Sequence, residues 1–321
     1  MKFGWATTGN EVVKHFKDKV SGSTFLITGP TPGGVGAESA KSLATGNPKH
    51  LILAGRTQSK IQPLIDELST SHPNVKVSFV QLDLSNLSSV RAAAANVKTP
   101  LGGDKIDVAI LNAAIMACPY ATTEQGVELQ FVTNHLGHFL FGNLLLQSDL
   151  IRSRVVVVSS LASQRKASLV MPHLEDLTYD HGKIYEPTVA YSVSKACNVL
   201  YAKRLAKVLA SRGISAFSLN PGSITTNLQA YMTDEMRQRA IKEYMIENPN
   251  FKIPERKNLQ QGCSTQLRAA LDPSLAAVSG AYLDDCNVSE TAEHKEAEPY
   301  MDQVWTLSEK LTGSKFDFGN Q

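Results

Sequence analysis

The sequence predicts an α/β protein built on one doubly wound, mostly parallel sheet with helices on both faces. Short, unbroken apolar runs alternate along the chain with longer segments whose apolar residues have helical spacing, which is typical of βαβ units. A glycine-rich turn also joins the first apolar run to a helical segment. With 321 residues, of which 42% are hydrophobic and 19% charged, the chain is large enough for one such domain.

The strands are expected to be buried on both faces, because the apolar runs lack the alternation of a half-exposed strand. These runs predict strands at residues 24–28, 50–54, 76–81, 106–111, 154–159 and 214–219, with a last strand near 280–283. Helices fill the gaps between them. They are expected at residues 37–43, 59–68, 85–97, 126–146 and 189–209.

The chain is expected to fold as a single domain over residues 1–321. Residues 1–23 form an N-terminal extension with a helix at 10–19, and residues 24–226 form the cofactor-binding and catalytic core. Residues 227–262 are polar and follow the sixth strand at the ligand-binding end of the sheet, which predicts a substrate lid. A surface pair of connecting helices is the alternative. Residues 263–321 make up the C-terminal part.

The composition argues against several kinds of partner. The net charge of +2 and the lack of a basic block argue against nucleic acid. The four cysteines are scattered, without the C-x-x-C spacing of a zinc site, so no metal is expected. Neither a secretory signal nor an apolar stretch of about 18 residues is visible, which predicts a cytoplasmic protein without an integral membrane segment.

The first expected strand leads into a glycine-rich turn that suits a pyrophosphate group. The turn runs from Gly29 to Gly36, and a helical segment follows it. Glycine lets the backbone approach phosphates closely, and the free N–H groups of a helix N-terminus donate hydrogen bonds to them. The turn therefore predicts a Rossmann-type dinucleotide site. A tight strand-to-helix turn without a ligand is the alternative.

Arg56 favours NADPH as the dinucleotide. Proteins that prefer NAD place an acidic residue about 20 residues beyond the glycines, where it accepts a hydrogen bond from the ribose 2′-hydroxyl. Here the second strand is followed by Gly55-Arg56-Thr57, and a guanidinium group attracts a 2′-phosphate. A solvated surface arginine is the alternative.

Two other segments are expected beside the cofactor. Asp83, in Leu82-Asp83-Leu84, could accept a hydrogen bond from the adenine amine, although an aspartate after a strand is also a common helix N-cap. Asn112-Ala113-Ala114 ends the fourth strand and would lie beside the adenosine ribose, where small residues permit close approach. Tight packing alone is the alternative for this second segment.

Tyr191 and Lys195 form the candidate catalytic pair. They are four residues apart in an expected helix, so both side chains lie on one face, about one turn apart. A nearby ammonium group favours phenolate and lowers the pKa of tyrosine, which lets it act as an acid or base closer to neutral pH. Such pairs are common on exposed helices, so the pair alone does not establish a site.

Further polar residues are expected near this pair. Ser160 follows the fifth strand, and Asn134 lies in a long expected helix. The carboxyl ends of parallel strands gather at one edge of a sheet. Ser160 should therefore share one crevice with the glycine-rich turn, Arg56 and Asn112.

In order and approximate spacing, these features closely resemble the short-chain dehydrogenase/reductase family, and the resemblance covers nearly the whole chain. Within that family, Phe3-Gly4-Trp5 and the segment from Asn134 to Phe139 resemble the retinol dehydrogenase and WW-domain oxidoreductase branch, although no WW domain is present. The motifs that carry the family resemblance are the glycine-rich turn, Asn112-Ala113-Ala114, Asn134, Ser160, Tyr191-x-x-x-Lys195 and Asn220-Pro221-Gly222.

The resemblance implies an NADP(H)-dependent enzyme that reduces a carbonyl group or oxidises an alcohol. Tyr191 would donate a proton to the carbonyl oxygen, and Ser160 would hydrogen-bond that oxygen. Lys195 would bind the nicotinamide ribose and lower the pKa of Tyr191, while Asn134 would hold a water molecule in a proton relay. The implied cradle of the nicotinamide consists of Pro221, Gly222, Ser223, Ile224 and Thr226.

The glycine-rich turn departs from the family pattern. Four residues separate Gly29 from Gly34, where the family has three. Pro30 and Pro32 lack backbone N–H donors, so the phosphates must be held by other groups of the turn. The remaining candidate phosphate contacts are Thr31, Gly34 and Val35.

The leading hypothesis is a carbonyl reductase for a fairly apolar ketone or aldehyde, because Ile115, Met116 and Tyr120 are expected near the pocket. Two alternatives stay open. One is a cofactor-sensing scaffold without catalysis, and the other is a dehydratase, epimerase or cyclase on the same scaffold. Members of the family often form dimers or tetramers through the helices that begin near Gly126 and Val189, so a homo-oligomer is one assembly that the resemblance allows.

Overall fold

A computed structural model describes residues 2–249, 251–289 and 291–319. Its core is an eight-stranded sheet with the strand order β10-β9-β6-β5-β4-β1-β2-β3. The strands pair in parallel, except that β9 and β10 are antiparallel. The strands are β1 (Thr24–Thr28), β2 (His50–Gly55), β3 (Lys76–Gln81), β4 (Ile106–Leu111), β5 (Ile151–Val158), β6 (Ser215–Leu219), β9 (Tyr282–Asp284) and β10 (Asn287–Val288).

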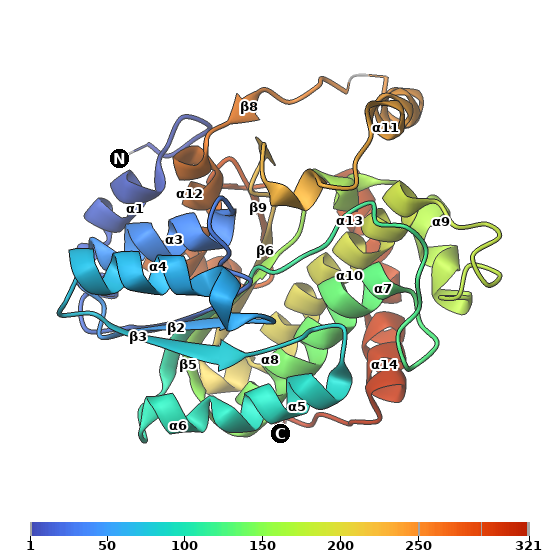
Figure 1. The fold of residues 1–321 in the computed structure, drawn as a ribbon. Coiled ribbons are helices and arrows are strands. Elements are labelled where there is room, and N and C mark those ends of the chain that lie inside the picture. Colours follow the sequence, from blue (N-terminus) through green and yellow to red (C-terminus); the bar gives the residue numbers. More distant parts are fainter. Residues whose placement is uncertain (1, 250, 290, 320–321) are drawn as a thin grey trace.

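Helices cover both faces of this sheet, as Figure 1 shows. One face is covered by α1 (Gly9–His15), α3 (Val35–Ala44), α4 (Gln58–Ser71) and α12 (Leu259–Leu271). The other is covered by α5 (Leu87–Asn96), α8 (Gly137–Gln147), α10 (Pro187–Val208) and α14 (Met301–Thr312). Shorter helices are α2 (Lys17–Val20), α6 (Lys98–Leu101), α7 (Leu129–Phe131), α9 (Ala167–Val170) and α13 (Ala292–Ala297).

The strands are apolar throughout because they feed two separate cores. Successive side chains of a strand point to opposite faces of the sheet. In β1, Phe25 and Ile27 belong to the core beneath α3 and α12, while Leu26 belongs to the core beneath α8 and α10. All three side chains are fully buried, which explains the unbroken apolar runs. The predicted α/β fold with a mostly parallel sheet is confirmed.

Some predicted boundaries differ from the structure. The fifth strand begins at Ile151 rather than 154, because Ile151 pairs with Ile106 across an irregular register. The helix predicted from residue 126 begins only at Leu129, where the Glu128 side chain accepts hydrogen bonds from the first N–H groups. A π-helical turn, Val132–Leu136, then separates α7 from α8.

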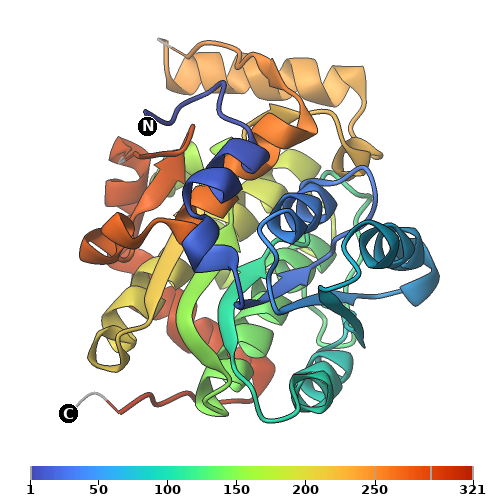
Figure 2. The same cartoon turned by 90° about the vertical axis from the view of Figure 1, so that its left-hand side faces the viewer.

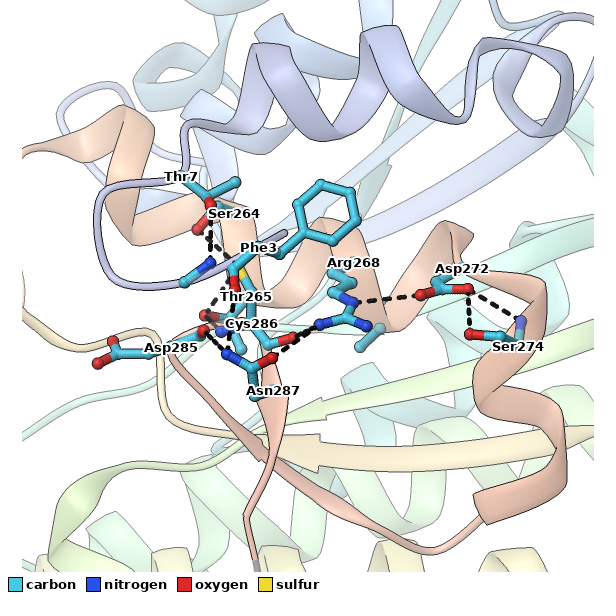
Figure 3. Close-up of polar contacts among 12 residues, drawn as sticks. Phe3, Thr7, Ser264, Thr265, Arg268, Asp272, Ser274, Asp285, Cys286 and Asn287 are labelled. Atoms are coloured by element: carbon cyan, nitrogen blue, oxygen red, sulfur yellow. Dashed lines mark hydrogen bonds and ion pairs between the residues drawn. The ribbon is translucent and has the colours of Figure 1, made fainter. Parts of the chain in front are cut away.

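The N-terminal extension is tied to the C-terminal part of the chain (Figure 3). The guanidinium carbon of Arg268, in α12, lies 4.9 Å from the centre of the Phe3 ring. Asn287 donates a hydrogen bond to the carbonyl oxygen of Phe3 at 3.3 Å, and Arg268 donates to the side chain of Asn287 at 3.2 Å. The Gly4 N–H closes the turn by donating to Thr7 Oγ1. Phe3 therefore packs against α12 and is hydrogen-bonded to β10.

Residues 227–262 lie at the end of the molecule where the strands have their carboxyl ends, as Figures 1 and 2 show. The segment contains one long helix, α11 (Asp234–Glu247), followed by a short strand, β8 (Arg256–Lys257). β8 pairs in parallel with β7 (Ser223–Ile224), so it straps the segment to the core. Within the described residues of this segment, α11 and the two-residue strand β8 precede the start of α12 at Leu259.

Candidate active site

One cavity of about 960 Å³ opens at the carboxyl ends of the strands. It lies where β1 and β4 are neighbours, although they are not consecutive in the chain. Open α/β sheets bind ligands at such a switch in strand order. Sixteen of the predicted site residues line the cavity. They are Gly29, Thr31, Gly34, Val35, Arg56, Asp83, Leu84, Asn112, Ala113, Ser160, Tyr191, Lys195, Pro221, Gly222, Ile224 and Thr226.

The glycine-rich turn passes directly beneath the end of β4. Gly29 has a left-handed φ of 64°, and a Cβ atom there would lie 2.7 Å from the Cβ atom of Ala113. Both the backbone conformation and the contact exclude a side chain. Gly29 is therefore required for the close approach of β1 to β4, whatever ligand the turn binds.

Some backbone N–H groups of this turn form hydrogen bonds within the turn, and others do not. The N–H of Thr31 bonds to the Gly29 carbonyl at 2.9 Å, and the N–H of Gly34 bonds to the Thr31 carbonyl at 3.0 Å. Two of the backbone donors considered for the phosphates are thus used within the turn. Gly34 is the N-cap of α3 and provides no side chain, so the N–H groups of the first helical turn, beginning at Val35, face the cavity.

Arg56 and Asp83 lie at the end of the cavity formed by β2 and β3. Arg56 is exposed and forms no hydrogen bond or ion pair within the described part of the chain, so its guanidinium is available to a ligand. Asp83 Oδ1 accepts hydrogen bonds from the N–H and hydroxyl of Ser85. The alternative of Asp83 as a helix N-cap is wrong, because Asn86 caps α5 by accepting from the Ser89 N–H.

Asn112 joins the two central strands at the floor of the cavity. Its side chain donates to the Thr28 carbonyl at 2.9 Å, and its N–H donates to the Thr28 hydroxyl at 2.8 Å. The Ala113 N–H donates to the same hydroxyl at 3.0 Å. Asn112 therefore holds the ends of β1 and β4 together beside the space where the adenosine ribose was predicted.

Tyr191 and Ser160 meet at the other end of the cavity. Tyr191 lies in the first turns of α10, is 5% exposed, and forms a side-chain hydrogen bond with Ser160. Ser160 follows β5 in an extended conformation, and its Oγ accepts from the Ala162 N–H at 3.2 Å. Burial raises the pKa of Tyr191 to about 12, although the Ser160 hydrogen bond acts in the opposite direction.

Lys195 lies beneath Tyr191 on the same face of α10. Its Nζ is 5.6 Å from the centre of the Tyr191 ring and donates to the Val158 carbonyl at 3.0 Å. The residue is 1% exposed, and burial lowers its pKa to about 7. The predicted lowering of the Tyr191 pKa by Lys195 is not found in the protein alone. Burial holds both groups toward their neutral forms, which outweighs their mutual attraction.

Asn134 stands behind the wall of the cavity rather than on its surface. It lies in the π-helical turn, is fully buried, and exchanges two hydrogen bonds with the backbone of Ile115 at 2.8 and 2.9 Å. Its amide also donates to Ser194 at 3.0 Å. The side chain thus braces the loop after β4 that carries Ile115, and its neighbour in the π turn, Thr133, lines the cavity instead.

The segment after β6 curves around the region expected to hold the nicotinamide. Gly222 has a left-handed φ of 100°, and a Cβ atom there would lie 2.7 Å from Lys257 Cδ. Lys257, in β8, is buried and forms an ion pair with Asp285 at 2.5 Å. β8 therefore packs directly against the predicted nicotinamide cradle, and only glycine fits at position 222.

Apolar side chains line the cavity beyond Tyr191. Ile115 and Met116 border it as predicted, but Tyr120 does not. The Tyr120 ring packs against Tyr185 instead, and its hydroxyl donates to the Thr178 carbonyl. The segment 227–262 supplies most of the remaining apolar wall, which sequence reasoning did not assign residue by residue: Tyr231, Met232, Ile241, Tyr244, Phe251 and Ile253.

Known proteins resemble this chain over most of its length. The family model for short chain dehydrogenases matches residues 23–172. Retinol dehydrogenase 11 of Homo sapiens is 33% identical, over 93% of this chain and 88% of the human protein. The WW domain-containing oxidoreductase of Drosophila melanogaster is also 33% identical, over 97% of this chain and 73% of that protein. This chain belongs to the short-chain dehydrogenase family.

Solved structures share this fold. A protein of Mycobacterium paratuberculosis is 30% identical and superposes with a TM-score of 0.68, over 93% of this chain and 96% of that one. An NADPH-bound carbonyl reductase from chicken fatty liver is 21% identical, with a TM-score of 0.58 over 84% of this chain and 99% of the other. The second likeness concerns the fold alone. The predicted Rossmann-type sheet and the predicted branch of the family are both confirmed.

The described residues contain neither a cluster of metal ligands nor a helix long and apolar enough to cross a membrane. The cavity of this short-chain dehydrogenase itself offers groups suited to acid–base chemistry and to anion binding. They comprise a protonated phenol, a hydroxyl group beside it, a buried amine and, at the far end, an unpaired guanidinium.

Proposed function

We propose that the protein is an NADPH-dependent carbonyl reductase that acts on a fairly apolar ketone or aldehyde, or on the corresponding alcohol in reverse. The observation that carries the proposal is the hydrogen-bonded pair of Tyr191 and Ser160, above Lys195, in the same cavity as the glycine-rich turn and Arg56. With a volume of about 960 Å³, this cavity lies at the upper end of the range of small-molecule and cofactor sites.

The residues of the cavity fit NADP(H). Glycines at the turn leave room for phosphates, the free N–H groups at the start of α3 would donate hydrogen bonds to them, and Arg56 has a guanidinium available for a 2′-phosphate. Lys195 and the segment around Gly222 would hold the nicotinamide riboside. When bound, NADPH supplies the hydride for carbonyl reduction.

Tyr191 is suited to the proton step of a reduction. With a pKa raised to about 12, its phenol is protonated at neutral pH and can donate to the carbonyl oxygen. Ser160, which already bonds to Tyr191, would donate to the same oxygen and orient it. In its charged form, Lys195 would then stabilise the phenolate that remains, because a positive charge beside the phenolate lowers its energy.

The walls favour an apolar substrate. Met116 and Ile115 on one side and Met232, Tyr244 and Ile241 of the lid on the other leave few polar groups near Tyr191. The names of the related retinol dehydrogenases denote an apolar alcohol, which is in keeping with this lining. Localisation in the cytoplasm stays a prediction from the sequence.

Cofactor titration with Arg56→Ala tests the nucleotide part of the proposal. Hydrogen bonds to a charged group contribute about 1.5–3 kcal/mol, so the Kd for NADPH should rise roughly 10- to 100-fold while the Kd for NADH changes little. Fluorescence titration of both dinucleotides measures this. Arg152→Ala is the matched control, because Arg152 is exposed and lies at the start of β5, the end of the strand away from the cavity. Equal losses for both dinucleotides, or none, would remove Arg56 from the cofactor site.

Reduction of decanal, an apolar aldehyde, tests the chemical part. Tyr191→Phe removes the proton donor, and loss of a general acid lowers kcat by about 10²–10⁴. NADPH binding should stay nearly unchanged. Wild-type protein that binds NADPH but reduces no aldehyde or ketone would favour the alternatives of a cofactor-sensing scaffold or an epimerase, dehydratase or cyclase.

A further inference from the structure

The backbone carbonyl of Ser160 is held by the C-terminal part of the chain as well as by its own turn. The Ser163 N–H donates to it at 3.0 Å and the Ser163 hydroxyl at 2.7 Å. The hydroxyl of Tyr282, from β9, donates at 3.3 Å. Three donors therefore converge on the peptide group that adjoins the catalytic hydroxyl.

His294 stands behind this clamp. It lies in α13, and its Nε2 is 2.9 Å from Ser163 Oγ, with both residues almost completely buried. Its ring packs against the Tyr282 ring at 4.4 Å between centres, edge to face. One histidine therefore contacts both side chains that donate to the Ser160 carbonyl.

The hydrogen-bond directions determine the tautomer of His294. A serine hydroxyl has one proton, and Ser163 donates it to the Ser160 carbonyl, which can only accept. Nε2 must then carry the imidazole proton and donate it to Ser163 Oγ. Burial, assisted by the charge of Lys203, lowers the pKa of His294 to about 4, so at neutral pH the ring has this single N–H.

The position of the Ser160 carbonyl matters because the catalytic hydroxyl belongs to the same residue. Ser160 is extended, with φ −168° and ψ 161°, and its Oγ lies between the Ala162 N–H and the Tyr191 hydroxyl. A rotation of the following peptide group would move Oγ relative to Tyr191. Misplacement by about 1 Å can lower the rate of an enzyme roughly 100-fold.

On the basis of the proposed function, we propose that His294 is a positioning residue for carbonyl reduction. Its Nε2–H holds the Ser163 hydroxyl on the Ser160 carbonyl. This contact fixes the Ser160 hydroxyl against Tyr191 and the substrate oxygen. The reacting groups thus lie between residues 160 and 195, and a residue about a hundred positions further along the chain sets their geometry. His294 does not line the cavity.

The variants His294→Ala, His294→Gln and His294→Asn test this role. The Gln amide nitrogen falls near Nε2 and can donate to Ser163, whereas the Asn amide is one bond shorter and falls near Nδ1. With NADPH and decanal, we expect kcat to fall about tenfold in the Ala and Asn variants and to recover in the Gln variant. The Kd of NADPH should not change.

His50→Gln is the matched control, because His50 is equally buried and its Nε2 lies 2.9 Å from Ser78 Oγ, far from the cavity. It should leave kcat unchanged. A purely structural role for His294 would instead lower thermal stability in all three variants, without a difference in kcat between Gln and Asn, and that pattern would overturn the proposal.

A double-mutant cycle with Ser163→Ala distinguishes an effect that His294 exerts through Ser163 from a general loss of packing. Because His294 acts through Ser163, the double variant should be no slower than the slower single variant. Effects that multiply would mean that the two residues act independently, contrary to the proposal.

Nitrogen NMR of histidine-labelled protein tests the arrangement without any turnover. His294 should show the Nε2–H tautomer, and Ser163→Ala should shift its signal. An Nδ1–H tautomer would refute the clamp even if carbonyl reduction is confirmed. A wild-type protein that reduces no aldehyde, with the predicted tautomer present, would instead refute the proposed function and leave the hydrogen-bond geometry standing.

Discussion

Lys195 lies where burial opposes its charge. The ordinary pKa of lysine is about 10.4, and burial lowers that of Lys195 to about 7 in the folded protein. Between these two values the unfolded chain binds the proton and the folded protein does not. The free energy of unfolding therefore rises with pH across this window, since stability increases wherever the unfolded state binds more protons.

The pH dependence of the free energy of unfolding reports on the Lys195 amine. We expect the free energy of unfolding of the wild type, relative to Lys195→Met, to increase as the pH is raised from about 7 to about 10. Below about 7 the difference should level off, because both states then carry the charge. Urea unfolding in a series of buffers measures it. Lys207→Met, on the exposed side of the same helix, is the control, and an identical pH profile for both variants would contradict the burial of the charge.

At the scale of elements, a buried ion pair joins α11 to the loop that follows Ser160. Arg165, five residues beyond Ser160, donates from Nε to Glu247 at 3.0 Å and also pairs with Glu243 at 3.2 Å. Its side chain is 8% exposed and that of Glu247 is 13% exposed. The guanidinium also lies 5.6 Å from the ring centre of Tyr244, which lines the cavity. This pair therefore holds the wall of the substrate region in place.

Arg165→Ala should loosen α11 and raise KM for decanal by about tenfold. Removing one partner of a buried pair costs roughly 3–5 kcal/mol, because the other charge stays buried without compensation. Arg239→Ala is the control on the same helix, since Arg239 is half-exposed and pairs with Glu186 at the surface, where pairs contribute about 0–1 kcal/mol. Hydrogen exchange of the α11 amides should accelerate in the first variant only. Equal exchange in both would show that the ion pair does not hold the helix.

The sequence predicted most elements because each carried its own local pattern. β1, β3 and β4 match their predicted limits, since a run of apolar residues bounded by polar ones marks both ends. The π-helical turn at Val132–Leu136 has the same apolar spacing as an α-helix, so periodicity could not reveal it. The β7–β8 strap has two residues per strand and depends on a partner distant in the chain, which leaves no periodic signal.

At the scale of the molecule, the carboxyl edge of the sheet explains why motifs predicted separately lie in one cavity. The residues that sequence reasoning missed come from segments that reach this edge only through tertiary packing. His294 and Tyr282 contact the turn after Ser160 across more than a hundred residues of chain, and Arg165 meets Glu247 across 82. No local motif marks such residues, because a buried histidine or an arginine on a loop is ordinary in isolation.

The C-terminal helix bears on the assembly of the whole molecule. α14 packs on α8 and α10, the helices through which relatives were expected to associate. The Trp305 ring lies 5.0 Å from Phe139 of α8 and 6.1 Å from Tyr201 of α10, measured between ring centres. His135, just before α8, hydrogen-bonds Ser308 of α14 at 2.9 Å. The apolar surface that a second subunit would need there is already covered by the chain itself.

We therefore expect the protein to be a monomer of 34.8 kDa in solution, rather than the homo-oligomer that the family resemblance allows. Light scattering on a size-exclusion column measures the mass. Trp305→Ala, which weakens the α14 contact, should increase association in a concentration-dependent way, because exposed apolar helix faces favour self-association. Trp5→Ala is the control, since Trp5 is 38% exposed on the N-terminal extension. A wild-type dimer whose cross-links map to α8 and α10 would mean that α14 leaves these helices, and would refute the assignment of α14 as their permanent cover.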